Sequence, residues 1–117
     1  MTDEGGKPFQ GARLSKIMHQ QTLHPARNPQ DWFDFEIAVE NGTYRVRVEA
    51  GDHYAATWQR VEFEGVEAGT FGLPRGELRW TEEKRVTVRD GRLTVRIHLR
   101  DDRTPAGLRK LVFDATP

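Results

Sequence analysis

The sequence predicts an all-β protein, an antiparallel β-sandwich of the jelly-roll type. Two observations favour this fold. Apolar and polar residues alternate with a period of two through most of the chain after residue 32, and turn signals such as Asn41-Gly42 and Asp90-Gly91 separate the alternating segments. No long segment has the 3.6-residue period of an amphipathic helix. Because each strand has one apolar side, packing sheet on sheet is the simplest way to bury those sides, and a closed barrel is the alternative.

The alternation predicts about seven short strands. The first two, over residues 33–39 and 44–48, are expected to form a hairpin around Asn41-Gly42. A third strand is centred on Val61 and Phe63, and the Gly- and Pro-rich residues 65–76 are expected to be a long loop.

The remaining strands follow from the same pattern. A short strand is expected at 78–80, a second hairpin over 84–99 turns at Asp90-Gly91, and a closing strand lies over 108–115. The register predicts one buried set of side chains and one exposed set. The buried set is Val46, Val48, Val61, Phe63, Val95 and Ile97, and the exposed set is Arg45, Arg47, Arg92 and Arg96.

Length and composition bound the organisation of the chain. Its 117 residues fit one domain, with residues 1–8 as a disordered lead and 9–117 as the sandwich. Residues 9–31 are polar and are expected to form a loop over the core or a short helical turn. The balance of 18 basic and 18 acidic residues argues against a nucleic-acid partner. The absence of cysteine excludes disulfides and thiolate metal sites.

Localisation stays open on the sequence. No apolar run approaches the ~20 residues that span a membrane, so no membrane insertion is expected. The first ten residues, MTDEGGKPFQ, are acidic and Gly-rich, unlike a signal peptide. The chain is either intracellular or one domain of a longer secreted or cell-surface protein.

The sequence contains no pattern typical of a catalytic site, so we expect no enzyme. Ser15 is the only serine, and its context RLSKIM lacks the Gly-x-Ser-x-Gly frame of a nucleophile elbow. Most acidic residues fall on the polar sides of strands, which is ordinary for a solvated sheet. His19 and His24 are five residues apart and match no familiar metal-binding spacing, and the sequence identifies no metal ligands.

The loop DHYAATW, residues 52–58, is the best candidate for a ligand site. A sugar offers C–H patches and hydroxyls, so a sugar site needs an aromatic ring beside fixed hydrogen-bonding groups. Asp52, His53, Tyr54 and Trp58 supply these groups directly after a strand. The alternative is that Tyr54 and Trp58 cap the core, while Asp52 only ends the strand through an Asx-type turn.

Other residues are weaker candidates for the same chemistry. His19 and Gln21 would reach the same end if the N-terminal segment crosses the sandwich, although a plain loop role is the alternative. Trp32 and Trp80 are large enough to be platforms, but their places in or beside strands favour burial. The four outward arginines would attract an acidic polysaccharide if they formed one stripe, whereas the interleaved glutamates indicate a solvated face.

The order of motifs resembles the galactose-binding-like superfold. The segments NGTYRVRVEAGD, VEFEGV and VTVRDGRLTVRIHL are similar in order and spacing to malectin-like domains and to the N-terminal domain that precedes the catalytic part of rhamnogalacturonan acetylesterases. The resemblance implies a jelly-roll module of carbohydrate-active proteins, which sits beside a catalytic domain and in some members binds sugar. Some members hold a structural calcium near the chain ends, and no other cofactor is implied.

We therefore expect a non-catalytic, carbohydrate-associated binding module, an accessory domain of a carbohydrate-active or cell-surface protein. Its expected partners are a carbohydrate ligand and a companion catalytic domain or another protein. The alternative is a structural interaction domain that packs against a protein and binds no sugar. Fold alone does not decide between the two, because function depends on the site.

Overall fold

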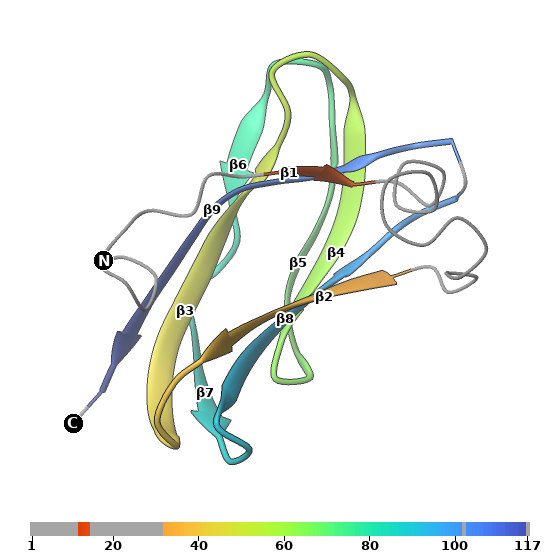
Figure 1. Ribbon diagram of the computed structural model, residues 1–117. Helices are drawn as coiled ribbons and strands as arrows, with labels where there is room; N and C mark the ends of the chain where they lie inside the picture. Colours follow the sequence, from red (N-terminus) through yellow and green to blue (C-terminus); the bar gives the residue numbers. More distant parts are fainter. Residues whose placement is uncertain (1–11, 15–31, 102, 117) are drawn as a thin grey trace.

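The computed structural model confirms the all-β class and describes residues 12–14, 32–101 and 103–116. In this part of the chain the structure forms two antiparallel sheets packed face to face, as a sandwich (Figure 1). The strands are β1 (Ala12–Leu14), β2 (Trp32–Ala38), β3 (Gly42–Gly51), β4 (Thr57–Phe63), β5 (Val66–Leu73), β6 (Leu78–Trp80), β7 (Lys84–Val88), β8 (Arg92–His98) and β9 (Ala106–Ala115).

One sheet, here the β3 sheet, has the strand order β1-β9-β3-β6, and β7 also pairs with β3. The first half of β3 pairs with β7 and its last three residues with β6, while β9 runs along its other edge. The second sheet, here the β8 sheet, has the order β2-β8-β4-β5. Among the described residues, no helix is long and apolar enough to cross a membrane.

The predicted register of the core is confirmed. All six side chains expected inside are fully buried between the sheets: Val46, Val48, Val61, Phe63, Val95 and Ile97. Arg45 and Arg92 are exposed as expected. Arg47 and Arg96 are only half-exposed, because each guanidinium lies over a tryptophan ring, at 4.3 Å from the centre of Trp80 and 3.7 Å from that of Trp32.

The two predicted hairpins are wrong. β2 and β3 lie in opposite sheets, and so do β7 and β8, so both turns carry the chain from one sheet to the other. The two turns bind each other instead. The amide of Gly91 donates to Asn41 Oδ1 at 2.7 Å, and the amide of Val39 donates to the carbonyl of Gly91 at 3.0 Å. The alternation was informative about which side of each strand is buried, but not about which strand is its neighbour.

A hairpin does join β4 to β5, where the sequence predicted a long loop over 65–76. Its turn is Glu64-Gly65, and both residues have positive φ values, 49° and 82°. Two consecutive left-handed residues form the turn that matches strand twist, and a glutamate rarely marks one. The Glu64 carboxylate accepts a hydrogen bond of 2.6 Å from the amide of Thr94 on β8, which anchors the turn.

Of the N-terminal segment, residues 1–31, the structure describes residues 12–14. Residues 12–14 form the edge strand β1 beside β9, where a loop or a helical turn was expected. The predicted disordered lead, residues 1–8, lies outside the described residues. The domain boundaries stay a prediction.

Candidate functional site

Two glycines position the loop that follows β3. Gly51 ends the strand with a φ of 115°, a left-handed conformation that favours glycine. A Cβ on Gly51 would collide with the carbonyl oxygen of Glu77, and a Cβ on Gly107 would collide with the carbonyl of Gly51. The backbone segments around Gly51, Glu77 and Gly107 therefore lie in direct contact at this end of the sandwich. Such contact fixes where the loop over residues 52–56 begins.

Asp52 holds the loop in place through hydrogen bonds made at its buried side. Its side chain is buried, with 8% of the residue exposed. The amide of Tyr54 donates to Asp52 Oδ2 at 2.8 Å, and this confirms the Asx-type turn that the sequence left as an alternative. The carbonyl of Asp52 accepts a 2.9 Å hydrogen bond from the amide of Gly76. Asp52 thereby ties its own loop to the turn between β5 and β6.

Tyr54 and His53 are presented to solvent by this loop. Tyr54 is 78% exposed, which contradicts the alternative that its ring caps the core. His53 is exposed as well, and the two rings meet edge to face with centroids 6.1 Å apart and an interplanar angle of 64°. Leaving a large ring in water forgoes the stabilisation that burial would give. The exposed tyrosine is thus available for contact with a ligand.

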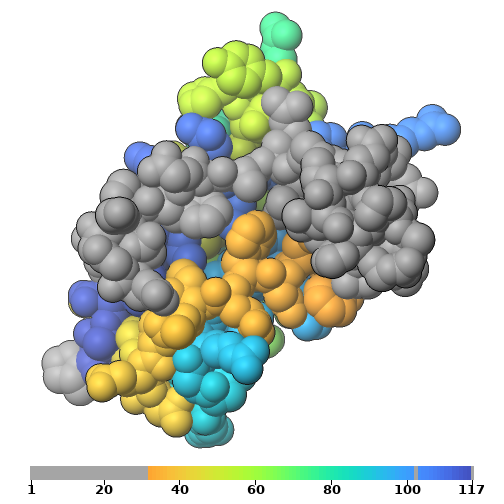
Figure 2. Space-filling model, viewed as in Figure 1, coloured from red at the N-terminus to blue at the C-terminus, as the bar shows by residue number. Residues whose placement is uncertain are grey.

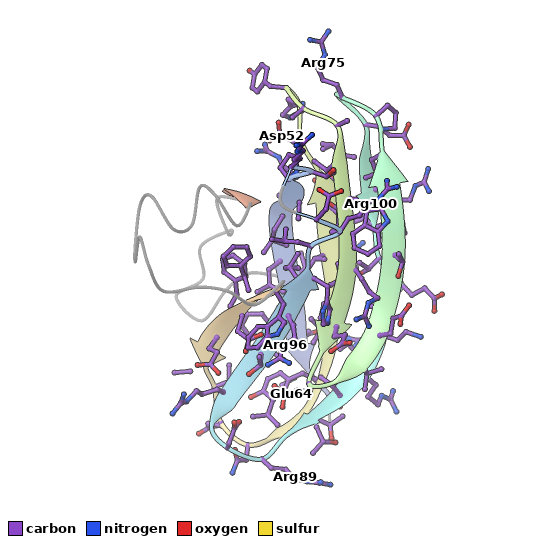
Figure 3. All side chains as sticks on the ribbon, turned by 90° about the vertical axis from the view of Figure 1, so that its right-hand side faces the viewer. Asp52, Glu64, Arg75, Arg89, Arg96 and Arg100 are labelled. Atoms are coloured by element: carbon purple, nitrogen blue, oxygen red, sulfur yellow. The ribbon has the colours of Figure 1, made fainter. Side chains whose placement is uncertain are left out.

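The turn between β5 and β6 completes this end. The amide of Glu77 donates to the carbonyl of Pro74 at 3.1 Å, and Gly76 takes a φ of 87°. In Figure 2, the yellow-green atoms of the β3–β4 loop and the teal atoms of this turn protrude together at one end of the molecule. We call this end, residues 52–56 and 74–77, the tip. Figure 3 shows Arg75 at the tip, beyond Asp52 and pointing away from the sheets.

Arg75 is a residue of the tip that the sequence did not identify as part of a site. It lay within the segment expected to be a loop, and its neighbours Pro74 and Gly76 are a turn signal. What the sequence could not reveal is that this turn is hydrogen-bonded to the loop over residues 52–56, through Gly76 and Asp52, which are 24 residues apart in the chain. The hydrogen bond between Gly76 and Asp52 is a long-range contact that no local pattern encodes.

Trp58 is not brought together with the three loop residues. It is the second residue of β4, and its neighbours Thr57 and Gln59 point into the core, so Trp58 is half-buried on the outer face of the β8 sheet. Its ring lies beside Gly72 of β5. His19 and Gln21, the other candidates, lie outside the described residues.

The outer face of the β8 sheet carries a network of close contacts between basic and acidic side chains. Arg96 donates to both oxygens of Asp34 at 2.8 and 3.0 Å, and these bonds raise the pKa of the guanidinium above its usual value. The Glu62 carboxylate lies 3.0 Å from Arg60 and 3.1 Å from His98 Nε2. A polar ligand on this face would have to displace these pairs.

The four outward arginines do not form one stripe. Arg45 and Arg47 lie on β3 and Arg92 and Arg96 on β8, so the pairs occupy opposite outer faces of the sandwich. Most are also paired. Arg45 lies 3.1 Å from Asp114, and Arg92 lies 3.1 Å from Glu36. The solvated-face interpretation of these residues is therefore the correct one.

Metal ligation finds no basis in the residues that the structure describes. No three of their His, Asp or Glu side chains form a group able to hold a metal ion. Calcium in proteins takes six to eight oxygen ligands, mostly from carboxylates and carbonyls. The structural calcium that the resemblance implies near the chain ends stays an expectation, because residues 1–11 and 117 lie outside the described residues.

Comparison with known proteins supports the architecture. No protein-family model and no curated protein matches the sequence. Among solved structures, the chain is similar to the YXIM protein of Bacillus subtilis, with a TM-score of 0.52 and 23% identity over 71% of this chain. The match covers 22% of that protein, so this chain spans about a fifth of its length.

Two more distant structures are carbohydrate-binding modules. One is a family 35 module from Clostridium thermocellum, with a TM-score of 0.45 and 20% identity over 72% of this chain and 70% of that one. The other is a CBM36 module solved with calcium and xylotriose, with a TM-score of 0.45 and 15% identity over 71% and 72% of the two chains. Likenesses this distant indicate nothing about the ligand of this chain. What the comparison with the YXIM protein shows is a shared fold, the β-sandwich.

Proposed function

We propose that this chain is a non-catalytic carbohydrate-binding module and that its sugar binds at the tip. The observation that carries the proposal is the exposure of Tyr54, 78%, on a loop whose backbone is fixed by two hydrogen bonds of Asp52. An aromatic ring on a fixed backbone offers contact area at little cost in conformational entropy. Tyr54 would stack against the C–H face of a sugar ring, and His53 would hydrogen-bond to its hydroxyls.

Asp52 takes a supporting role in this proposal. Because its carboxylate is buried and accepts the amide of Tyr54, it acts as a positioning residue that holds the loop. Trp58 lies on a sheet face, so it would contact a sugar only if the ligand extended from the tip along the outer face of β4. Without Trp58, the tip offers a sugar one large exposed ring, that of Tyr54. We therefore expect weak binding, since each ring and each net hydrogen bond contributes about 1 kcal/mol to the free energy of binding.

Weak binding suits an accessory domain. We propose that the module acts beside a catalytic domain and holds it near its substrate, as the resemblance to the N-terminal domain of rhamnogalacturonan acetylesterases and to malectin-like domains implies. A tethered module raises the local concentration of the catalytic partner even when its own affinity is modest. We therefore expect the module to be part of a carbohydrate-active or cell-surface protein.

A glycan array probed with the 117-residue chain tests the proposal. Tyr54→Ala should abolish binding without lowering the thermal midpoint, because the ring is mostly in water. Val66→Ala is the matched control, since Val66 is the other exposed large apolar residue in the part of the chain that the structure describes. It is 42% exposed and follows the Glu64-Gly65 turn at the start of β5.

The outcomes separate the two candidate functions. Loss of binding in Tyr54→Ala with retention in Val66→Ala supports the sugar site at the tip. Equal binding by the wild type and Tyr54→Ala contradicts the site. The absence of binding to any neutral or acidic glycan contradicts the function itself and leaves the protein-interaction domain as the better account.

A further inference from the structure

We infer that Asn41 is the site of a spontaneous covalent modification, deamidation through a succinimide ring, and that its contact with Gly91 holds this reaction back in the folded chain. The inference does not depend on the proposed sugar site. Asn41 and Gly91 lie in the two turns that carry the chain between the sheets, from β2 to β3 and from β7 to β8. Figure 1 shows these turns side by side at the bottom of the molecule, the end away from the tip.

Deamidation requires an asparagine whose next residue has a main-chain N–H and little bulk. The chain has two asparagines, and Asn28 precedes Pro29, which carries no N–H. Asn41 precedes Gly42, whose missing Cβ leaves space beside its nitrogen. Both residues are exposed, and a Cβ on Gly42 would meet no atom within 4 Å beyond its chain neighbours. Asn41 is therefore the one asparagine of the sequence that is suited to this chemistry.

The reaction involves Asn41, Gly42 and water. The main-chain nitrogen of Gly42 bonds to Cγ of Asn41, the bond from Cγ to Nδ2 breaks, and Nδ2 leaves as ammonia with the hydrogen that the Gly42 nitrogen gives up. Water then opens the succinimide ring at one of its carbonyl carbons. Opening at Cγ leaves an aspartate. Opening at the main-chain carbonyl leaves an isoaspartate, whose main chain is longer by one carbon.

In the folded chain the side chain of Asn41 is held by the neighbouring turn. Its Oδ1 accepts a 2.7 Å hydrogen bond from the amide of Gly91, whose carbonyl accepts the amide of Val39 at 3.0 Å. Gly42 is the first residue of β3 and pairs with Val88 of β7. Ring closure requires Cγ of Asn41 to rotate onto the nitrogen of Gly42, so the hydrogen bond from Gly91 must first break. Deamidation should therefore occur from a locally opened state.

The same hydrogen bond restrains a second reactive pair. Asp90-Gly91 is the one Asp-Gly pair of the sequence, and in its isomerisation the Gly91 nitrogen would attack Cγ of Asp90, with loss and later return of water. In the structure the Gly91 amide donates to Asn41, while Asp90 Oδ1 accepts the amide of Arg92 at 3.1 Å. An aspartate at position 41 keeps an acceptor oxygen in the same place, whereas an isoaspartate moves it. Formation of isoaspartate at position 41 should therefore release Gly91 and speed the isomerisation of Asp90.

The test follows both reactions in one incubation. The folded protein and the same chain unfolded in guanidinium chloride are kept in warm, neutral buffer, and the peptides that contain Asn41 and Asp90 are assayed by mass spectrometry and for isoaspartate. Deamidation adds one negative charge to a chain with 18 basic and 18 acidic residues, so ion exchange separates the product as well. Deamidation of Asn41 should be at least roughly tenfold slower in the folded chain, because it requires local opening. Equal rates in the two states would overturn the inference.

Two substitutions at position 41 isolate the role of the contact. Asn41→Asp keeps an acceptor for the Gly91 amide and should leave the isomerisation of Asp90 at the wild-type rate. Asn41→Ala removes the acceptor and should speed that isomerisation roughly three- to tenfold, the effect of losing about one net hydrogen bond. Val61→Ala is the control, since Val61 is fully buried on β4 and its truncation lowers the overall stability of the fold. It should leave the rate at Asp90 close to that of the wild type.

Two results with these variants would contradict the inference. An unchanged rate at Asp90 in Asn41→Ala would show that the contact between the turns does not restrain the reaction. An equal acceleration in Val61→Ala would show that the reaction requires unfolding of the whole domain rather than opening of the two turns.

Discussion

The side chain of Gln59 accepts a hydrogen bond of 2.8 Å from the backbone amide of Gly107 through its Oε1 atom. Gln59 lies on β4 of one sheet and Gly107 on β9 of the other, so this bond connects the two layers inside the sandwich. Gln59 is fully buried, and its Nε2 atom donates to the carbonyl of Phe71 at 3.0 Å. Both the oxygen and the nitrogen of this buried side-chain amide are hydrogen-bonded. Gln59 therefore holds the two sheets in a fixed arrangement next to the tip.

Gln59→Leu should destabilise the protein although it makes the core more apolar. It leaves the buried amide of Gly107 without a partner, which costs about 1–3 kcal/mol. The measurement is the free energy of unfolding in urea. Thr70→Ala, on the exposed side of β5, is the control and should change little. A neutral or stabilising Gln59→Leu would show that the amide of Gly107 finds another partner.

Gly107→Ala should be among the most destabilising single substitutions in the chain. The new Cβ would collide with the backbone of Gly51, which cannot move aside as a side chain can. We expect a loss of about 3 kcal/mol or more, or failure to fold.

Gly72→Ala is the matched control for that prediction. Its Cβ would meet only Trp58 Cδ1, at 3.5 Å, an ordinary contact. The strand should tolerate the methyl group or gain slightly from it, because glycine weakens a strand. Equal losses from the two alanines would contradict the direct backbone contact between β3 and β9.

The left-handed turn at Glu64 predicts an unusual order of stability. Both Glu64→Gly and Glu64→Ala remove the hydrogen bond to the amide of Thr94. Only the glycine accepts a φ of 49° without strain, so Glu64→Gly should be more stable than Glu64→Ala by about 1 kcal/mol. Chemical denaturation of the two variants measures this difference. The opposite order would exclude the left-handed conformation at this position.

Arg96→Ala should lower stability by about 1–1.5 kcal/mol, whereas register alone suggests a silent change. The structure differs from that expectation because Arg96 pairs with both oxygens of Asp34 and stacks on Trp32. Arg92→Ala, which breaks only the more exposed pair with Glu36, should cost less than about 0.5 kcal/mol. Thermal midpoints of the two variants measure this difference. Equal midpoints would show that the contacts of Arg96 with Trp32 and Asp34 add no stability beyond that of an exposed ion pair.

Local pattern predicted the core but not the pairing. The period of two places Val46 and Ile97 inside whether their strands are neighbours or face each other across the sandwich. Asn41-Gly42 and Asp90-Gly91 are true turns, yet each turn joins strands of different sheets. Whether such a turn forms a hairpin within one sheet or carries the chain to the other sheet depends on contacts with distant strands. The alternation of apolar and polar residues holds no information about those contacts.

The sequence predicted only part of the candidate site, because only residues that are neighbours in the chain leave a local pattern. Asp52, His53 and Tyr54 are consecutive, so their joint position at a loop follows from the end of a strand. Trp58 was expected beside them, but the start of β4 already turns it onto a sheet face. Arg75 joins the tip through a hydrogen bond between distant segments and left no local signal of that role.

The most direct test of a sugar site at the tip is an amide chemical-shift titration of the 15N-labelled protein with neutral and uronic acid oligosaccharides. If sugar binds at the tip, the largest shifts should cluster on the amides of residues 52–56 and on those of 75–77 in the neighbouring turn. They should be absent in Tyr54→Ala. Shifts confined to the outer faces of the sheets, or no shifts with any oligosaccharide at millimolar concentration, would contradict it.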